Sequence, residues 1–395
     1  MSPPRAATAL RRFSGPEADE LSILCQPEGT PADVAVQAEA AYGALAALLA
    51  QAGASGADVA SETIFLRDIQ RDLAVILDVR SRVLAAAGQA AGAVAPGVIE
   101  QAPLDGDAAL AVAAAAVVPR HRAAWAVRDV PAVPACGCAG CARTAARLVQ
   151  LGDQVTLYST NIYGVGGDGY AEALQMFEAG EALLARCGMT FRDVVRTWIH
   201  LRDIDRDYDA LNRARRAFFL GRGVDPRPAS TGVQGGPAPD GHAFSLRLQA
   251  QRSPRPLALA PMSTPTLNEA WSYGADFSRG LRVVEANKIA LHVSGTASID
   301  EAGQTVHVGD VAAQVERMLR NIATLLEQQG ASFADLVSGI VYLKRPADAP
   351  LLRDLCRRHG FEGFPCAVVD APLCRPELLC EAEALAMLPL DARAA

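Results

Sequence analysis

The sequence lacks the features that would place it in a membrane, outside the cell or on a nucleic acid. Its longest apolar run, residues 108–118, is too short to cross a bilayer. Residues 1–14 have no long apolar core, so they form no secretory signal and are predicted to be a disordered lead-in. The net charge of −7 excludes the broad positive surface that binds nucleic acid or acidic membranes. A cytoplasmic protein is expected.

The nine cysteines are an odd number, and without an export signal reduced thiols are expected. Cys136, Cys138 and Cys141 lie in a Pro-rich segment and can hold Zn²⁺ if a fourth ligand comes from elsewhere. The candidates for that ligand are Cys25, Cys187 and His200. A redox role and ordinary reduced thiols are the alternatives, because no second Cys-x-x-Cys half is visible. The sequence assigns no metal or cofactor.

What the sequence does contain is one pattern written three times, over residues 47–69, 182–204 and 324–343. In each copy an amphipathic helix ends at a glycine, a short loop that contains an aspartate follows, and a β-rich stretch comes next. The glycines are Gly53, Gly188 and Gly330. They lie a domain length apart, so each repeat is a domain rather than a solenoid unit.

The order of elements in the second and third copies indicates the fold class. Each shows a β-hairpin, a helix, a strand, a second helix and a closing strand. This order predicts an α+β sandwich, a mixed sheet with two helices on one face. The bare sheet face must be covered, which predicts association between copies or between chains.

The first copy is less regular, because its opening and closing strands are hard to find. Residues 84–118 are rich in Ala, Gly and Val and are interpreted as filler and linker. The predicted organisation has four parts: a lead-in over residues 1–14, a degenerate unit plus linker over 15–128, a second unit over 129–255 and a third over 256–395.

The last strand carries two carboxylates in an apolar run. Glu381 and Glu383 share one face, and Cys380, Ala382 and Ala384 share the other, because strand side chains alternate. Acids on an apolar strand break a local rule, and such breaks cluster at functional sites. The alternative is an edge strand with its acids in water.

The repeat, with its Gly-x-x-x-x-Asp hinge and terminal Glu-x-Glu strand, resembles the Rid (YjgF/UK114) family. That resemblance implies a chorismate mutase-like fold and a trimeric or pseudo-trimeric assembly with ligand sites between neighbouring units. Residues 150–388 more closely resemble chorismatases, which carry two Rid-like units per chain. The shared motifs are Arg196-Thr-Trp198, Tyr208…Asn212…Arg215, Pro228-Ala-Ser-Thr-Gly232, Trp271-x-Tyr273-Gly, Phe277-Ser-Arg279, Ser294-Gly-Thr-Ala-Ser-Ile299, His307-x-Gly-Asp310 and Cys374-Arg-Pro-Glu-Leu-Leu-x-Glu381.

The resemblance implies cleavage of the enolpyruvyl ether of chorismate to pyruvate and a hydroxybenzoate or dihydroxycyclohexadiene acid, without a metal. It puts the general acid at Glu381. A vinyl ether is activated by protonating its methylene carbon, which needs a carboxylic acid kept protonated near neutral pH. An apolar strand and the like charge of Glu383 would both raise the pKa of Glu381.

Chorismate is a dicarboxylate, so its cleft needs arginines, which hold carboxylates by paired hydrogen bonds. The candidate arginines are Arg279, Arg196, Arg215 and Arg375. Each has the alternative of a surface or structural ion pair. Tyr273 and Tyr208 are candidates for binding a ring hydroxyl. Gly295 and Thr296 lie where the backbone approaches ligand or forms a simple bulge.

Cys374 bears on the product. The chorismatase subgroup that makes 3-hydroxybenzoate has a cysteine here, whereas the hydrolase subgroup has a smaller residue. A partly ionised thiol beside Arg375 would act as a nucleophile or steer proton removal toward aromatisation. The alternative is a small buried apolar side chain. The 3-hydroxybenzoate product is favoured.

Two other functions are open. A Rid-type enamine or imine deaminase would use an arginine after the proline before the final strand, but Pro365 is followed by Cys366. A non-catalytic trimer that binds a small acid is the other alternative. Convergence of Glu381, Arg279 and Cys374 on one cleft would favour the enzyme. A small carboxylate ligand and a homotrimer are the expected partners.

Overall fold

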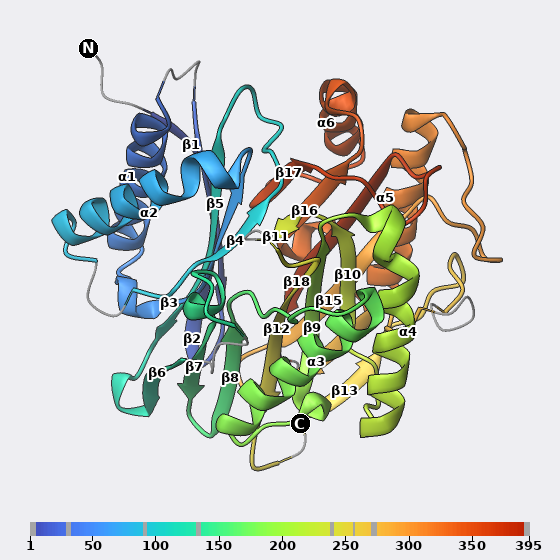
Figure 1. Ribbon diagram of the computed structural model, residues 1–395. Helices are drawn as coiled ribbons and strands as arrows, with labels where there is room; N and C mark the ends of the chain where they lie inside the picture. Colours follow the sequence, from blue (N-terminus) through green and yellow to red (C-terminus); the bar gives the residue numbers. More distant parts are fainter. Residues whose placement is uncertain are drawn as a thin grey trace.

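The computed structural model describes residues 5–28, 33–89, 93–131, 136–237, 241–255, 257–269 and 275–390. Over these ranges the chain forms three six-stranded mixed sheets, each covered by helices on one face (Figure 1). The predicted α+β class is confirmed.

Each sheet belongs mainly to one third of the chain. The first unit has β1 (Ala6–Ser14), β2 (Ala18–Pro27), α1 (Val34–Gln51), β3 (Val59–Leu66), α2 (Ile69–Ala86), β4 (Gly97–Glu100) and β5 (Leu110–Pro119). The second has β6 (Trp125–Pro131), β7 (Ala145–Leu151), β8 (Gln154–Ser159), α3 (Gly169–Arg186), β9 (Val194–Leu201), α4 (Ile204–Arg222), β10 (Ala229–Gln234), β11 (Gly236–Pro237) and β12 (Phe244–Arg252). The third has β13 (Ala258–Pro261), β14 (Gly280–Val284), β15 (Ile289–Ala297), α5 (Val311–Glu327), β16 (Leu336–Leu343), α6 (Ala349–Arg358), β17 (Cys366–Asp370) and β18 (Cys380–Leu388).

The three sheets repeat one strand order. The closing strand (β5, β12 or β18) lies between the hairpin and the strand that follows the first helix. A short strand after the second helix pairs parallel to that strand, as β4, β10 and β17 do. The sequence pattern did not predict these short strands. β11 leaves its own unit and pairs with β4, so the second unit extends the first sheet.

The hinge between the first helix and the next strand is the same in all three units. Gly53, Gly188 and Gly330 have φ of 72°, 69° and 71°, a left-handed conformation that ends each helix. A one-turn 3₁₀ helix follows, and a Ser or Thr and an Asp three residues later cap it reciprocally. The predicted glycine stop and aspartate loop are confirmed.

Two expectations for the first unit were wrong. Residues 6–14, expected in a disordered lead-in, form β1, an edge strand paired along its length with β2. Residues 97–100 and 110–119, interpreted as filler and linker, form β4 and the central strand β5. β5 is largely buried on both faces, so it shows none of the polar–apolar alternation that marks a half-exposed strand.

α1 has the length and composition of a membrane span, and 44% of that window is buried inside the molecule. Its buried side chains Tyr42, Leu45 and Leu49 pack in the apolar core of the first unit. α1 is therefore placed as the core helix of this unit.

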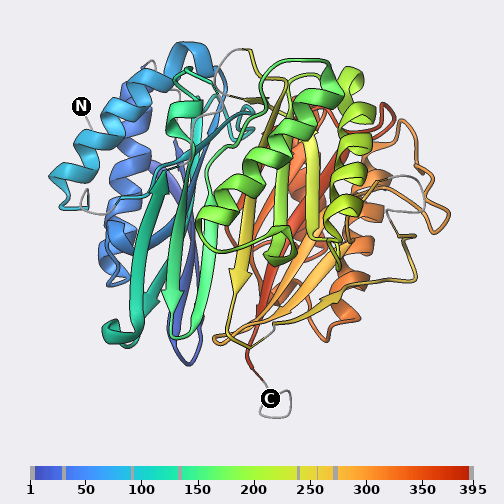
Figure 2. The ribbon, with the colours of Figure 1, turned by 60° about the horizontal axis from the view of Figure 1, so that its bottom comes forward.

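The sheets face one another and the helices lie outside, as Figures 1 and 2 show from two sides. One inter-sheet cluster joins Phe65, Val233 and Tyr342, which come from the first, second and third units. Two further clusters join the second unit to the third and the first to the second. The bare sheet faces of the three units cover one another within one chain, which is one of the two predicted forms of association. The homotrimer of separate chains stays a prediction.

A buried ionic cluster ties the three units together. Lys288 Nζ lies 2.7 Å from Glu20 Oε1 in the first unit and 2.7 Å from Glu285 Oε2 in the third. Gln251 of the second unit donates to Glu285 at 2.9 Å. Burial alone would lower the pKa of Lys288, but the two carboxylates raise it above its usual value.

Lys288→Met is expected to lower the free energy of unfolding by about 3–5 kcal/mol, because it leaves two carboxylates buried without their cation. Urea unfolding followed by circular dichroism measures the loss. The control is Lys344→Met, which removes an exposed ammonium bonded to the carbonyl of Pro376 and should cost less than about 1 kcal/mol. Equal losses in the two variants would contradict a structural role for the cluster.

Candidate active site

A pocket of about 310 Å³ opens between the second and third units. Helix α4 supplies Tyr208, Asn212 and Arg215 to its wall, and β10 supplies Ser230 and Gly232. The third unit supplies the facing wall, from the segment before β14, from β15 and from the segment that leads into β18. The pocket therefore lies between two units of one chain.

Glu381 lies on this wall, at the second residue of β18 in the centre of the third sheet. It pairs with Ala297 of β15 and Tyr342 of β16, and its residue is 5% exposed. Burial raises the pKa of Glu381 to about 8, and the charge of Glu383 adds to the rise. Nearby arginines oppose the rise without cancelling it. Glu381 is therefore largely a neutral carboxylic acid at neutral pH.

The alternation of β18 produces this placement. Cys380, Ala382 and Ala384 pack in the core beneath helix α5, as predicted. Glu381 and Glu383 point to the other face, toward the second unit, and are both buried. The alternative of acids standing in water is wrong for both.

Gly295 gives Glu381 its space. β15 shifts register between Val293 and Thr296, so Gly295 lies in a bulge beside the acid. A Cβ at Gly295 would stand 2.0 Å from Glu381 Oε1. Gly295 also lines the pocket, so the bulge and the close approach expected of this segment occur together. Any larger residue there would displace the carboxyl group.

Glu383 is held apart from the pocket by three donors. Arg196 Nη2 lies 2.8 Å from Glu383 Oε2, Trp198 donates to Oε1 at 2.6 Å, and Tyr342 donates at 3.1 Å. Arg196 was predicted to bind substrate, but it does not line this pocket. It supports the site instead: it donates to Thr231 Oγ1 at 2.6 Å, which accepts the N–H of Gly295.

Three other predicted arginines do line the pocket. Arg279 donates to the backbone and side-chain oxygens of Asn268 at 2.7 and 3.1 Å, which fixes its guanidinium. Arg215 donates to Asn212 at 2.6 Å. Arg375 donates to the carbonyl of Gly303 at 2.8 Å. Positive charge therefore reaches the pocket from three different segments.

Phe277 was not predicted as a site residue, although its motif was matched. The guanidinium carbons of Arg215 and Arg279 lie 5.3 and 5.8 Å from its ring centre. The ring of Phe277 therefore separates the guanidinium groups of Arg215 and Arg279 and forms an apolar wall between them. An apolar residue in a loop carries no chemical signal in the sequence, which is why it was missed.

Cys374 and Tyr208 meet in the pocket, and Tyr208 hydrogen-bonds the thiol. Burial raises the pKa of Cys374 to about 12, and the charge of Glu381 adds to the rise. The lowering by Tyr208 and Arg375 is smaller. The expected partly ionised thiol is wrong: Cys374 is a neutral thiol.

Thr296, also predicted, does not line the pocket. Thr296 is 1% exposed and donates to the carbonyl of Ser294 at 2.9 Å, so it is structural. Tyr273 lies outside the described residues. Cys136, Cys138 and Cys141 do not line the pocket.

The other two units have no acid at the matching positions. By pairing with the neighbouring strand, Glu381 corresponds to Ala111 in β5 and to Ser245 in β12. Glu383 corresponds in the same way to Ala113 and Arg247. The acid pair therefore belongs to the third unit alone among the closing strands.

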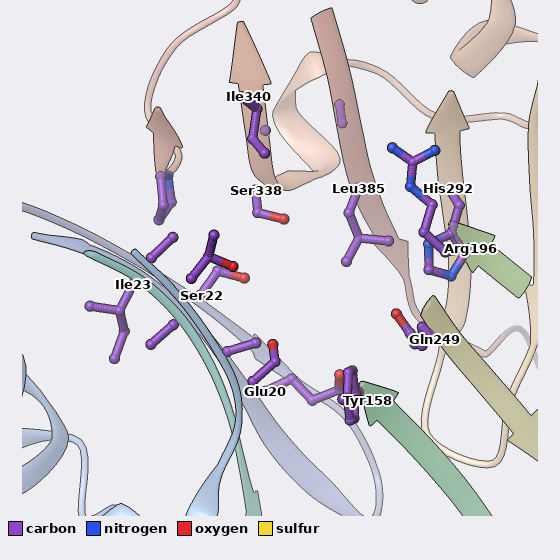
Figure 3. A pocket seen from close by; sticks show the side chains of 18 of the residues that line it. Glu20, Ser22, Ile23, Tyr158, Arg196, Gln249, His292, Ser338, Ile340 and Leu385 are labelled. Atoms are coloured by element: carbon purple, nitrogen blue, oxygen red, sulfur yellow. The ribbon is translucent and has the colours of Figure 1, made fainter. Parts of the chain in front are cut away.

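A second cavity of about 180 Å³ lies where the three sheets meet (Figure 3). Glu20, Tyr158, Arg196 and His292 point into it from different units. Its carboxylates are already paired, Glu383 with Arg196 and Glu20 with Lys288. Burial lowers the pKa of His292 to about 3, so it is neutral there. The pocket with the protonated acid is therefore the better candidate for chemistry.

Comparison with known proteins gives a consistent result. Residues 274–387 match the family model described as Endoribonuclease L-PSP. The 3-aminoacrylate deaminase RutC of Acinetobacter baylyi is 32% identical over 97 residues, which cover 24% of this chain and 77% of RutC. A 3-hydroxybenzoate synthase of Streptomyces hygroscopicus is 27% identical over 223 residues, 50% of this chain. A chorismatase crystal structure covers 84% of this chain and 93% of its own, with TM-score 0.60 and 17% identity.

A RutC family protein of Pyrococcus abyssi is 35% identical over 98 residues, 76% of its length, and the chain belongs to the RutC family. Over about half of its length the chain is also similar to the 3-hydroxybenzoate synthase. The match to the synthase covers 64% of that protein, so the chain spans just under two thirds of this curated relative. The solved chorismatase supports the shared fold. The family model identifies the third unit, at residues 274–387, as L-PSP-like.

Glu381 is expected to titrate near pH 8. Infrared difference spectra of wild type against Glu381→Gln isolate its carboxylic-acid band. Glu383→Gln should lower the pKa of Glu381, because it removes the neighbouring negative charge and frees the positive charge of Arg196. Glu377→Gln, a change at an exposed residue before β18, is the control and should leave this pKa unchanged. A Glu381 already ionised by about pH 5, like an ordinary glutamate, would refute the assignment.

Proposed function

We propose that this protein cleaves the enolpyruvyl ether of chorismate, releasing pyruvate and an aromatic or cyclohexadiene acid. The observation that carries the proposal is Glu381, a buried carboxylic acid with its pKa raised to about 8, in a pocket that three arginines enter. The similarity to a 3-hydroxybenzoate synthase and to a chorismatase supports it.

The acid step follows from the state of Glu381. It donates its proton to the methylene carbon of the enolpyruvyl group, which becomes a methyl group and leaves positive charge shared between the adjacent carbon and the ether oxygen. This charge weakens the bond from the ether oxygen to the ring carbon and opens the adjacent carbon to attack by water. Glu381 becomes a carboxylate as that charge forms, so the pair attract each other in a pocket of low dielectric. The raised pKa makes the donor available at neutral pH.

The arginines account for recognition of a dicarboxylate. Arg279, Arg215 and Arg375 reach the pocket from the segment before β14, from α4 and from the segment before β18. Guanidinium groups bind carboxylates by paired hydrogen bonds, so two of the three suffice for the two carboxylates of chorismate. Phe277 lies between two of them and presents an apolar ring to the cyclohexadiene.

The two kinds of product differ in whether the reaction consumes water. Cleavage to pyruvate and a hydroxybenzoate conserves all atoms of chorismate: the bond from the ring carbon to the ether oxygen breaks, that oxygen becomes the keto oxygen of pyruvate, and a ring proton returns to Glu381 as the ring becomes aromatic. The ring keeps the oxygen of its own hydroxyl group, and 3-hydroxybenzoate forms when that oxygen moves to the carbon that carried the ether. Cleavage to pyruvate and a dihydroxycyclohexadiene acid consumes one water. We favour 3-hydroxybenzoate: Cys374, the residue expected of that subgroup, lies beside Glu381 in the pocket, and after proton donation the Glu381 carboxylate is a base able to accept the ring proton.

The proposal needs no metal, because every step is assigned to a protein group. None of the nine cysteines forms a disulfide, which supports a reducing compartment such as the cytoplasm. A Rid-type deaminase is not favoured, since Cys366 begins β17 where that chemistry would use an arginine.

Wild-type protein is expected to release pyruvate from chorismate in an assay coupled to lactate dehydrogenase. Glu381→Gln should lower kcat by about 10²–10⁴-fold, the usual contribution of a general acid. kcat/KM should fall as pH rises through about 8, because the protonated form of Glu381 is the active one. Chromatography of the co-product distinguishes the three acids. Folded protein that releases no pyruvate, or a variant with the wild-type rate, would refute the proposal.

Gly295→Ala should lower kcat by about 10²-fold, the effect of displacing a catalytic group by roughly 1 Å. The matched control is Gly221→Ala on α4, where a Cβ would meet nothing within 4 Å. This control should keep the wild-type kcat. Thermal melting of both variants checks that they fold. A folded Gly295→Ala variant with full activity would show that the position of Glu381 does not matter to the reaction.

A further inference from the structure

Four metal-binding side chains meet at one end of the second unit, away from the candidate active site. Cys136 and Cys138 precede a 3₁₀ turn (Cys141–Arg143) that leads into β7, and His242 lies just before β12. Their ligand atoms all lie within 4.8 Å of one another. The sequence offered Cys25, Cys187 and His200 as partners for the three cysteines. The structure brings His242 instead, about a hundred residues further along the chain.

The distances fit one tetrahedral ion. Zinc bonds of about 2.3 Å to sulfur and 2.0–2.1 Å to nitrogen put tetrahedral sulfur atoms about 3.8 Å apart and sulfur about 3.6 Å from nitrogen. His242 Nε2 lies 3.8, 3.4 and 3.6 Å from the sulfur atoms of Cys136, Cys138 and Cys141. Cys136 Sγ lies 3.5 Å from Cys141 Sγ. A disulfide would need about 2.05 Å, so this pair is not bonded.

The histidine is oriented for coordination. His242 Nδ1 lies 2.7 Å from the carbonyl oxygen of Gly164, which only accepts hydrogen bonds, so Nδ1 carries the proton. In the neutral ring Nε2 then presents its lone pair to the three sulfur atoms. Tyr163 packs on the ring at 4.8 Å between centres, and Arg202 donates to the His242 carbonyl at 3.0 Å. The ring is therefore fixed before any ion binds.

The backbone is arranged for thiolates as well. The N–H of Cys138 points at Cys136 Sγ at 3.4 Å, and the N–H of Cys141 points at Cys138 Sγ at 3.3 Å. Amide donors stabilise sulfur that carries negative charge. Thiols without a metal or charge would gain little from such donors.

We propose that Cys136, Cys138, Cys141 and His242 bind one Zn²⁺ ion as a structural site. Four protein ligands leave no open position for substrate or water, which separates this site from a catalytic zinc. The three cysteines bind as thiolates, so any protons that they carry pass to solvent, while His242 binds as the neutral imidazole.

The ion cross-links two segments of the second unit beside the contact of that unit with the first. His242 lies a few residues after β11, the two-residue strand that extends the first sheet through β4. Next to the cysteines, Thr144 donates to the carbonyl of Asn161, and Asn161 Oδ1 accepts the N–H of Val98 in β4. Zinc therefore holds the segment before β7 against His242, next to this contact between the two units.

Metal analysis of the purified full-length protein, prepared without chelator, tests the site directly. We expect about one zinc per chain, lost in Cys138→Ser and in His242→Ala. Cys187→Ser removes a partly buried thiol of the same unit outside the cluster and should keep its zinc. Chelation of the wild-type ion under reducing conditions should lower Tm by more than about 5 °C, and Zn²⁺ should restore it.

Co²⁺ substitution gives a readout that does not depend on folding of the variants. Wild-type protein loaded with Co²⁺ should show intense visible bands of a tetrahedral ion and sulfur-to-cobalt charge transfer in the near ultraviolet. Protein that is purified without metal and takes up neither Zn²⁺ nor Co²⁺ under reducing conditions would overturn the proposal. Retention of stoichiometric zinc by both ligand variants would overturn it too.

Discussion

Each sheet in this protein has helices on one face only. The need to bury the other faces determines how the three units pack and where the candidate active site lies. The three bare faces cover one another, with apolar clusters at each junction and the Glu20–Lys288–Glu285 cluster between them. Polar groups on those faces lose their water and must find partners or change protonation. The candidate active site lies at one of these junctions, so its chemistry follows from the packing.

The two acids of β18 show both outcomes of that constraint. Glu383 forms an ion pair with Arg196 and accepts hydrogen bonds from Trp198 and Tyr342, which hold it as a carboxylate. Glu381, two residues earlier on the same face, lies beside a bulged glycine, and its pKa is raised. Like charges two residues apart on one strand resist joint ionisation, so fixing one as an anion helps keep the other protonated. The division of roles comes from their neighbours, since the side chains are identical.

Sequence reasoning succeeded where a local rule decides the structure. The glycine stops need a left-handed residue, and the alternation of β18 decides which side chains share a face, so both features could be predicted. β5 could not be recognised, because a strand buried on both faces loses its alternation. Arg196 was misplaced because a strand pattern does not say which of two cavities a long side chain enters. His242 was missed because it joins the cysteines only through tertiary structure.

The three units share a strand order but not a chemistry. Where the third unit has Glu381, the others have Ala111 and Ser245, and where it has Glu383 they have Ala113 and Arg247. In an assembly of identical subunits, one substitution alters every junction between subunits at once. Covalent linkage removes that coupling, so one cleft can keep its acid while another becomes pure scaffold. The chain is in effect a heterotrimer with a fixed order of subunits, in which no subunit can be exchanged or lost.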